Sequence, residues 1–161
     1  MKVLYEDNHI IVVEKEPNIP SQADKTGDID MLTMVKQYIK EKYKKPGEVY
    51  IGLVHRLDRP VGGIMVFART SKAASRLSEQ IRNKTFKKKY LAVVDGKFAN
   101  PKGTLEDYLY KDERNNISKV VNKDKKNAKL AKLDYEVLNY DDKRDLSLVK
   151  IDLHTRKTPS N

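Results

Sequence analysis

The segment whose residue types could do chemistry is a short polar run between two apolar stretches. Residues 55–59 are His-Arg-Leu-Asp-Arg, and they are followed by Gly62-Gly63 and by an apolar stretch that ends at Ala68. Side chains that directly precede a buried strand are held in fixed positions, so site residues are often found there. In this run Asp58 lies between two arginines. Nearby cations keep a carboxylate ionised, so Asp58 could act as a nucleophile or accept a proton.

Asp58 and the glycine pair that follows it could also have purely structural roles. Most aspartates next to arginines cap a turn or form a stabilising ion pair, and Asp58 taken alone fits that description. The pair Gly62-Gly63 does not indicate a phosphate-binding loop, because no Gly-Lys-Ser/Thr follows and no helix is expected to begin there. Two glycines at this point more simply permit a close approach of the backbone beside the site.

The wider sequence favours a chemical role for Asp58 through a family resemblance. Residues 55–70 resemble the signature of the RluA-type pseudouridine synthases, in which His-Arg-Leu-Asp precedes a small-Gly-apolar-apolar-Val-Phe-Ala pattern. Residues 3–15 are similar to the opening hairpin of that family, and residues 87–94 are similar to its second motif. The resemblance therefore covers nearly the whole chain. It implies an α+β fold with a mixed, mainly antiparallel central sheet and flanking helices.

The resemblance also implies roles for individual residues. Asp58 would be the nucleophile of an isomerisation that needs no cofactor and no metal. Arg56 would help to expose the target base, although without the resemblance a phosphate contact or a plain ion pair is equally open. Tyr90 would lie against the uracil and could move a proton, whereas the alternative is an ordinary half-buried strand tyrosine. We expect His55 to orient the loop by hydrogen bonding rather than to titrate.

Further cations are expected to bind the substrate. Arg59 lies beside Asp58, and Lys88 and Lys89 directly precede Tyr90, where they could hold phosphates. In the family a Leu-x-Thr strand is followed by Gly-Arg-x-His-Gln-Ile-Arg, whose arginine pairs with the nucleophilic aspartate. Here the third motif departs from that pattern after residues 153–155, and only Arg156 aligns with that arginine. We therefore expect a domain that is incomplete at its C-terminus.

Composition narrows the classes of partner and location. The 161 residues include 33 Lys and Arg against 23 Asp and Glu, and this net charge of +10 favours a polyanionic partner. With the resemblance, we expect ribosomal RNA, with transfer RNA as a second possibility. No apolar run approaches the ~20 residues of a membrane span, and no signal-like leader is seen, so a cytoplasmic protein is expected. Without cysteines there are no disulfides or thiolate sites, and the three scattered histidines argue against a metal centre.

The length predicts one domain over residues 1–161, with no S4 domain ahead of it, and the complete protein is expected to be a monomer. Alternation and helical spacing predict a hairpin over 3–15, a helix from 31 to about 44 capped by Asp30, and two central strands at 49–54 and 63–68. Ser71 is expected to cap a second helix, with Ala74, Leu77 and Ile81 on one face. Further strands are expected at 90–94, 105–110, 118–121, 131–137 and 146–153.

We therefore expect an RNA pseudouridine synthase. The alternative is a basic RNA-binding remnant of the same fold that has lost turnover. A DNA-binding regulator is disfavoured, because no helix-turn-helix with a basic recognition helix is evident. The chain as written is expected to be catalytically poor, because a sheet that stops after Leu153 leaves an exposed edge and Asp58 lacks the downstream arginine environment.

Overall fold

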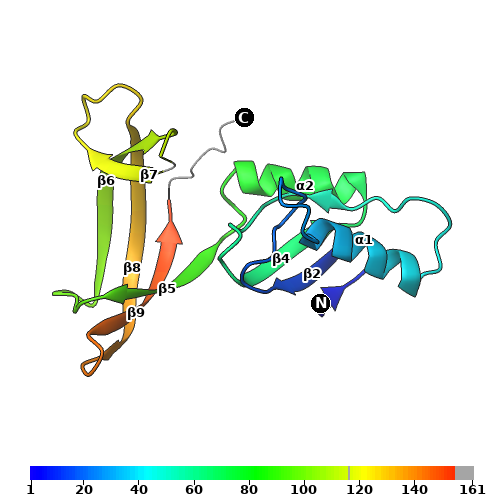
Figure 1. Cartoon of the computed structure of the whole chain (residues 1–161), viewed down its shortest axis with the longest axis horizontal. Helices are drawn as coiled ribbons and strands as arrows, with labels where there is room; N and C mark the ends of the chain where they lie inside the picture. Colours follow the sequence, from blue (N-terminus) through cyan, green and yellow to red (C-terminus); the bar gives the residue numbers. More distant parts are fainter. Residues whose placement is uncertain (116, 155–161) are drawn as a thin grey trace. The chain divides into compact units, whose positions relative to one another are not determined.

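The computed structural model describes residues 1–115 and 117–154, and its contacts divide the chain into two compact units. The first unit comprises Met1–Lys87 and the second begins at Lys88. Two helices and a four-stranded sheet form the first unit, and a five-stranded sheet forms the second (Figure 1). The predicted α+β class is confirmed, with its strands divided between two sheets, whereas the expected single domain stays a prediction.

The sheet of the first unit is antiparallel and has the strand order β1-β2-β4-β3. Its strands are β1 (Lys2–Glu6), β2 (Ile10–Lys15), β3 (Gly52–Leu53) and β4 (Gly63–Ala68). The predicted hairpin and the strand at 63–68 are confirmed. The segment 49–54 was expected to form a central strand, but only two of its residues pair, at the sheet edge. An added Cβ at Gly52 would lie 3.0 Å from the Ala74 Cβ, so this segment is closely packed against the second helix.

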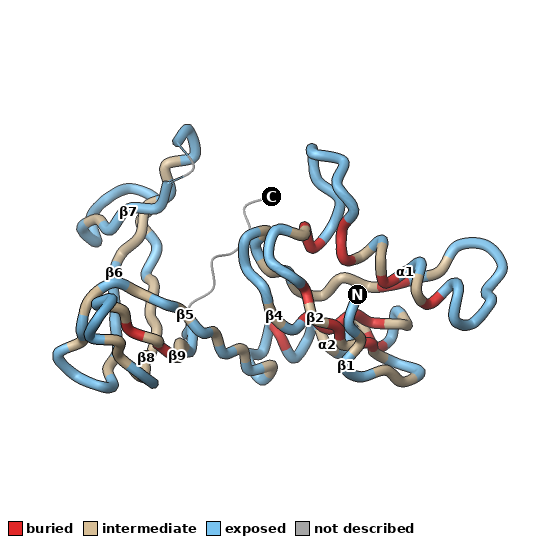
Figure 2. Tube along the Cα trace, turned by 60° about the horizontal axis from the view of Figure 1, so that its bottom comes forward, coloured by how far each residue is buried: buried red, intermediate tan, exposed pale blue. Residues whose placement is uncertain are grey.

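The core of the first unit lies between β2, β4 and the helix α1 (Met31–Lys42). Apolar residues recur along α1 at a spacing of four, which places them on one face of a helix. The apolar core cluster includes the fully or almost fully buried side chains of Ile11, Val13, Met31, Val35, Ile39, Met65 and Phe67, and their segments are red in Figure 2. Asp30 caps α1 as predicted, since its carboxylate accepts a hydrogen bond from the Thr33 N–H at 3.1 Å.

The second helix, α2 (Ser71–Arg82), begins where the sequence predicted but has a different cap. Thr70 rather than Ser71 is the N-cap residue, because its hydroxyl accepts from the Ala73 N–H at 3.1 Å. The predicted face of Ala74, Leu77 and Ile81 is the inward one, since Ile81 is buried and Ala74 and Leu77 are half-buried, and Ala73 is buried beside it. No helix within the described residues is long and apolar enough to span a membrane.

A buried carboxylate ties β1 to α1 and to the end of β4. The Glu6 side chain is only 8% exposed and accepts hydrogen bonds from Tyr38 at 3.0 Å, Lys42 at 2.8 Å and Arg69 at 3.2 Å. Tyr43 donates a further short hydrogen bond to it. Burial raises the pKa of Glu6, but the hydrogen bonds from Lys42, Tyr43 and Tyr38 outweigh burial, and the net pKa is lowered.

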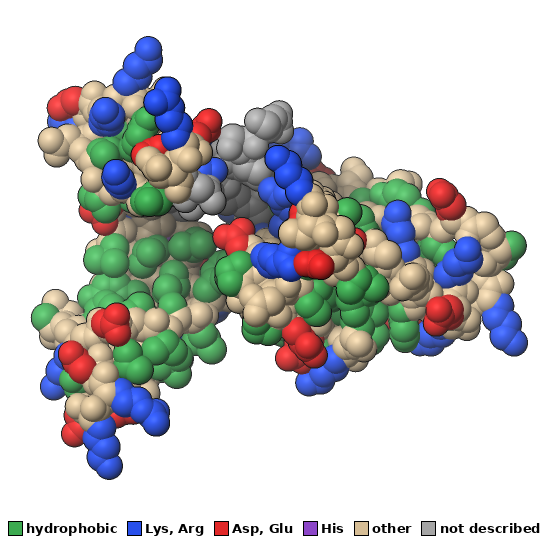
Figure 3. Space-filling view, in the orientation of Figure 1, with side chains coloured by type: hydrophobic (Ala, Val, Ile, Leu, Met, Phe, Trp, Pro, Cys, Tyr) green, Lys and Arg blue, Asp and Glu red, His purple; other side chains and the backbone are tan. Residues whose placement is uncertain are grey.

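The sheet of the second unit is antiparallel and has the strand order β5-β9-β8-β6-β7. Its strands are β5 (Lys89–Asp95), β6 (Lys102–Asp112), β7 (Ile117–Val121), β8 (Lys129–Asp141) and β9 (Leu146–Leu153). Among the described residues of this unit only Ser147 and Val149 are buried. Apolar side chains gather over the middle of this sheet with charged ones toward its ends (Figure 3). Leu91 and Val93 of β5 are exposed.

We predict that Glu6→Gln destabilises the protein by about 1–3 kcal/mol near neutral pH, because it removes the negative charge that four donors share. The lowered pKa means that Glu6 stabilises the fold above its ordinary pKa, and that this stabilisation is lost as the pH falls through the folded-state value. Urea unfolding at about pH 7 and about pH 3 measures both effects. Glu14→Gln is the control, since Glu14 pairs with Lys2 at the surface. Equal losses for both variants, or a Glu6→Gln loss that does not shrink in acid, would contradict the assignment.

Candidate active site

Asp58 lies in the loop that connects β3 to β4, residues 54–62, called here the Asp58 loop. The Val61 N–H donates to the Asp58 carbonyl at 3.0 Å and closes a turn, while the Asp58 residue is exposed. Asp58 is the first residue of this turn, and its exposed carboxylate is open to a ligand. Its position then depends on what holds the backbone on either side of it.

Ser21 holds the backbone just before Asp58. Its hydroxyl donates to the Leu57 carbonyl at 2.6 Å and accepts from the Leu57 N–H at 3.1 Å. Ser21 is itself buried. Because one side chain satisfies both polar groups of the same residue, Leu57 is fixed in place without a strand partner.

Lys15 holds the backbone just after Asp58. It is the last residue of β2, its side chain is fully buried, and its ammonium donates to the carbonyls of Glu16 at 3.2 Å, Arg59 at 2.9 Å and Val61 at 2.6 Å. A lysine ammonium has three donors and no acceptor, so these three carbonyls satisfy it completely. The Asn18 N–H donates to the Arg59 carbonyl as well, at 2.7 Å.

The charge of Lys15 belongs to the electrostatic surroundings of Asp58. Burial lowers the pKa of Lys15, and the positive charge of Arg59 lowers it further. The Asp58 carboxylate acts in the opposite direction and favours the charged ammonium. A buried cation therefore accompanies Asp58, and it comes from β2 rather than from the arginines beside Asp58 in the sequence.

His55 attaches the first part of the Asp58 loop to β4. The Val66 N–H donates to its Nε2 at 3.0 Å, and its ring lies 5.9 Å from the Phe86 ring, centroid to centroid. The ring nitrogen that accepts this hydrogen bond carries no proton. This hydrogen bond ties the His55 ring to β4, and the role of His55 in binding the substrate stays a prediction.

The two arginines of the loop differ in their surroundings. Both were expected to supply positive charge beside Asp58. The structure instead shows the Arg59 guanidinium in ion pairs with Asp24, at 3.3 Å, and with Asp28. Arg56 is exposed. The substrate-binding roles of Arg56 and Arg59 stay predictions.

The glycine pair that follows has the role expected of it. An added Cβ at Gly62 would lie 3.0 Å from the Pro17 Cδ, so the chain approaches closely there. Gly63 has a φ of +146°, a backbone conformation that residues with a side chain rarely adopt. Close backbone approach at the start of β4 is confirmed.

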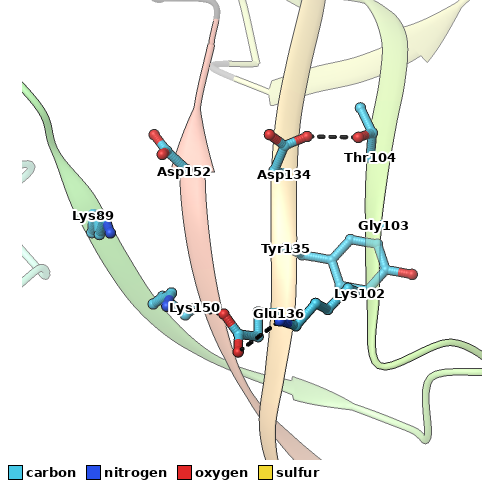
Figure 4. A pocket seen from close by; sticks show the side chains of 9 residues that line it. All are labelled: Lys89, Lys102, Gly103, Thr104, Asp134, Tyr135, Glu136, Lys150 and Asp152. Carbon is cyan, nitrogen blue, oxygen red and sulfur yellow. Dashed lines mark hydrogen bonds and ion pairs between the residues drawn. The ribbon is translucent and has the colours of Figure 1, made fainter.

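The other predicted site residues belong to the second unit. Lys88 is its first residue, and Tyr90 is a half-buried residue of β5 that pairs with Ile151 of β9. Lys89 lines a hollow of about 440 Å³ on this sheet together with Lys102 and Lys150 (Figure 4). Glu136 accepts from Lys150 at 2.9 Å and pairs with Lys102 at 3.5 Å, so much of that positive charge is neutralised locally. Arg156 lies outside the described residues.

The sequence analysis did not identify Lys15 or Ser21 as residues of the site. Lys15 could have been found from the alternation of β2. Ile11, Val13 and Lys15 alternate along β2 and so share its buried face. A lysine in an inward position needs internal acceptors, which marks it as a structural contact. Ser21 has no such signal, because it lies in a polar stretch. Within residues 1–115 and 117–154, no three His, Asp or Glu side chains are grouped to hold a metal ion.

The sequence of this chain is similar to known proteins over most of its length. The model of the RNA pseudouridylate synthase family matches residues 9–159. The chain belongs to this family. Among its relatives, the chain is 30% identical over 159 residues to an uncharacterised RNA pseudouridine synthase, YhcT, of Bacillus subtilis. It is also 31% identical over 125 residues, 78% of the chain and 38% of the relative, to the ribosomal large subunit pseudouridine synthase C of Buchnera aphidicola. The predicted RluA-type resemblance is confirmed.

A solved structure shows the same pseudouridine synthase fold. Human RNA pseudouridylate synthase domain containing 4 aligns with 96% of this chain and 59% of its own, at a TM-score of 0.77 and 21% identity. The match to YhcT takes in 98% of this chain but 51% of YhcT. The chain therefore spans about half the length of the pseudouridine synthases that it matches.

We predict that Lys15→Met lowers the free energy of unfolding by about 2–4 kcal/mol, because the carbonyls of Glu16, Arg59 and Val61 lose the hydrogen bonds that the Lys15 ammonium donates. Urea denaturation measures the loss, and Lys2→Met is the matched control, since Lys2 is an exposed residue that pairs with Glu14. The control is expected to change stability by less than about 0.5 kcal/mol. If Lys15→Met were as stable as Lys2→Met, the three hydrogen bonds would not hold the loop.

Proposed function

We propose that the protein containing this chain isomerises uridines in RNA to pseudouridine, with Asp58 as the nucleophile. The observation that carries this proposal is the exposed Asp58 carboxylate on a loop fastened before and after it by Ser21 and Lys15, in a member of the pseudouridylate synthase family. A preorganised nucleophile does not have to be ordered when the substrate arrives.

The chemistry suits a carboxylate. One Asp58 oxygen attacks C1′ of the ribose as the bond from C1′ to N1 of the base breaks. The released base turns, C5 bonds to C1′ and the carboxylate leaves. A proton leaves C5 and one is gained at N1, so substrate and product have the same atoms and electrons. Such a step needs a positioned nucleophile and a held base, without an oxidant or reductant.

The other predicted residues complete the proposal. Arg56 helps to expose the base, Tyr90 stacks on it, and His55 orients the loop. The cations Arg59, Lys88, Lys89 and Arg156 bind the RNA backbone. A relative from Buchnera aphidicola is named for the ribosomal large subunit. Ribosomal RNA in the cytoplasm is therefore the substrate that we propose first, with transfer RNA second.

A second candidate applies to the 161-residue chain on its own. Because only Ser147 and Val149 are buried among the described residues of the second unit, its sheet has a small core. That observation favours a chain that, when expressed alone, binds RNA but isomerises uridine poorly. Pseudouridine formation by this chain and by a protein of the relatives' full length, assayed on the same RNA, separates the two candidates.

We predict that Asp58→Asn in the full-length protein reduces pseudouridine formation to the uncatalysed background, because the amide is not a nucleophile at C1′. RNA affinity and melting temperature are expected to stay unchanged, since the side chain is exposed. Release of tritium from C5-labelled uridine in RNA measures turnover. Asp142→Asn, at another exposed aspartate, is the control. Substantial pseudouridine formation by Asp58→Asn would show that Asp58 is not the nucleophile.

We predict a graded result at Tyr90. Tyr90→Phe keeps the stacking face and therefore keeps RNA affinity, while Tyr90→Leu weakens binding by about 1–3 kcal/mol. Fluorescence anisotropy with a labelled substrate RNA measures both variants, with Tyr50→Leu as a control at an exposed tyrosine of the first unit. Equal affinity of Tyr90→Leu and Tyr90→Phe would make Tyr90 a structural residue of β5.

A further inference from the structure

The side chain of Arg59 is held by a single loop of the first unit, residues 21–30, called here the acidic loop. Nη1 donates to Asp24 at 3.3 Å and to the Thr26 hydroxyl at 3.1 Å. Nη2 donates a short hydrogen bond to Asp28. Two nitrogens of one guanidinium are thus directed at oxygens of two different carboxylates.

The acidic loop is folded around these contacts. Asp24 accepts from the Thr26 N–H at 2.9 Å, and the Asp28 N–H donates to the Thr26 hydroxyl at 3.2 Å. Gly27 between them has a φ of +74°, which a tight reversal of the chain requires. Hydrogen bonds from Thr26 lower the pKa of Asp24, and the hydrogen bond from Arg59 lowers that of Asp28, so both are negatively charged at neutral pH.

These ion pairs are accessible to an exchanging ligand. The side chains of Arg59 and Asp24 are each 38% exposed, and that of Asp28 is 53% exposed. Ion pairs at such exposure are weak, so a competing anion can replace the carboxylates. The backbone of Arg59 is not free in the same way, because Lys15 and Asn18 hold its carbonyl.

The geometry around Arg59 matches a phosphodiester. A guanidinium presents parallel N–H donors that fit the two non-bridging oxygens of a phosphate. The Thr26 hydroxyl donates to Asp24 in the RNA-free protein, and it adds a third donor once that carboxylate is displaced. Arg59 directly follows Asp58 in the chain, on the same hydrogen-bonded turn. A phosphate bound there would lie near the nucleotide that Asp58 attacks.

We propose that Arg59 and Thr26 form a binding position for a phosphate of the RNA backbone, and that Asp24 and Asp28 occupy this position in the RNA-free protein. RNA displaces the two carboxylates from Arg59 when it binds. This proposal rests on the proposed function, because the proposed function makes RNA the ligand. The carboxylates of the acidic loop then compete with RNA for the Arg59 guanidinium. Only an RNA that places a phosphate at Arg59 replaces the hydrogen bonds that the carboxylates give up.

The test measures the affinity of the full-length protein for a uridine-free single-stranded oligoribonucleotide at several salt concentrations. Asp24→Asn/Asp28→Asn is expected to bind about three- to tenfold more tightly, because the competitor has lost its charge. The slope of log affinity against log salt is expected to steepen by about 0.7, the value of one phosphate contact on a single strand, because in the parent the displaced carboxylates take up cations and offset the counterions released at this phosphate. Asp28→Asn alone, which leaves the Asp24–Thr26 turn intact, is expected to give a smaller gain in the same direction.

Two comparisons make the result specific to Arg59. Adding Arg59→Gln to the double variant is expected to abolish the gain, and Arg59→Gln alone is expected to weaken the parent affinity, because the bound phosphate loses its guanidinium. The control Glu14→Gln/Asp141→Asn adds the same two units of net charge at exposed carboxylates that pair with Lys2 and Arg144. No gain, a gain that survives Arg59→Gln, or an equal gain in the control would each overturn the proposal. Because this RNA holds no uridine, the result is independent of whether Asp58 isomerises uridine.

Discussion

The buried ammonium of Lys15 is the constraint on which the candidate site depends. Placing a charged group in the core is costly unless every donor finds an acceptor. The acceptors here are three backbone carbonyls, two of which belong to the Asp58 loop at Arg59 and Val61. They are available only when the loop wraps over the end of β2. Because Ile11 and Val13 fix β2 in the core, the packing of the core also sets the position of the loop.

This arrangement separates the charges around the loop into two groups. Lys15 lies beneath the turn and interacts with Asp58, while the Arg59 guanidinium is directed to Asp24 and Asp28. Among the described residues no ion pair within 4.0 Å includes the Asp58 carboxylate. The protein therefore holds the backbone of Asp58 tightly and leaves its side chain available, a combination that suits a nucleophile.

Local patterns in the sequence were sufficient for most of the fold. Apolar stretches predicted β2, β4 and β9, and the apolar spacing behind Asp30 predicted α1 with its cap. The cap of α2 was missed because Thr70 and Ser71 are both good capping residues, and only the backbone shows which one precedes the first turn. The site was less predictable, since Ser21 and Lys15 contact residues 36 to 46 positions away in the chain. Sequence spacing carries no direct record of such contacts.

Hydrogen exchange at single amides of the RNA-free protein tests most directly whether the Asp58 loop is preformed. The amides of Leu57, Val61 and Asn18 all donate to partners on or around this loop. If Ser21 and Lys15 fix it before RNA arrives, these three amides exchange about as slowly as those at the centres of β2 and β4. Exchange as fast as at Gly27, in the exposed acidic loop, would show that the Asp58 loop opens freely and would contradict the account.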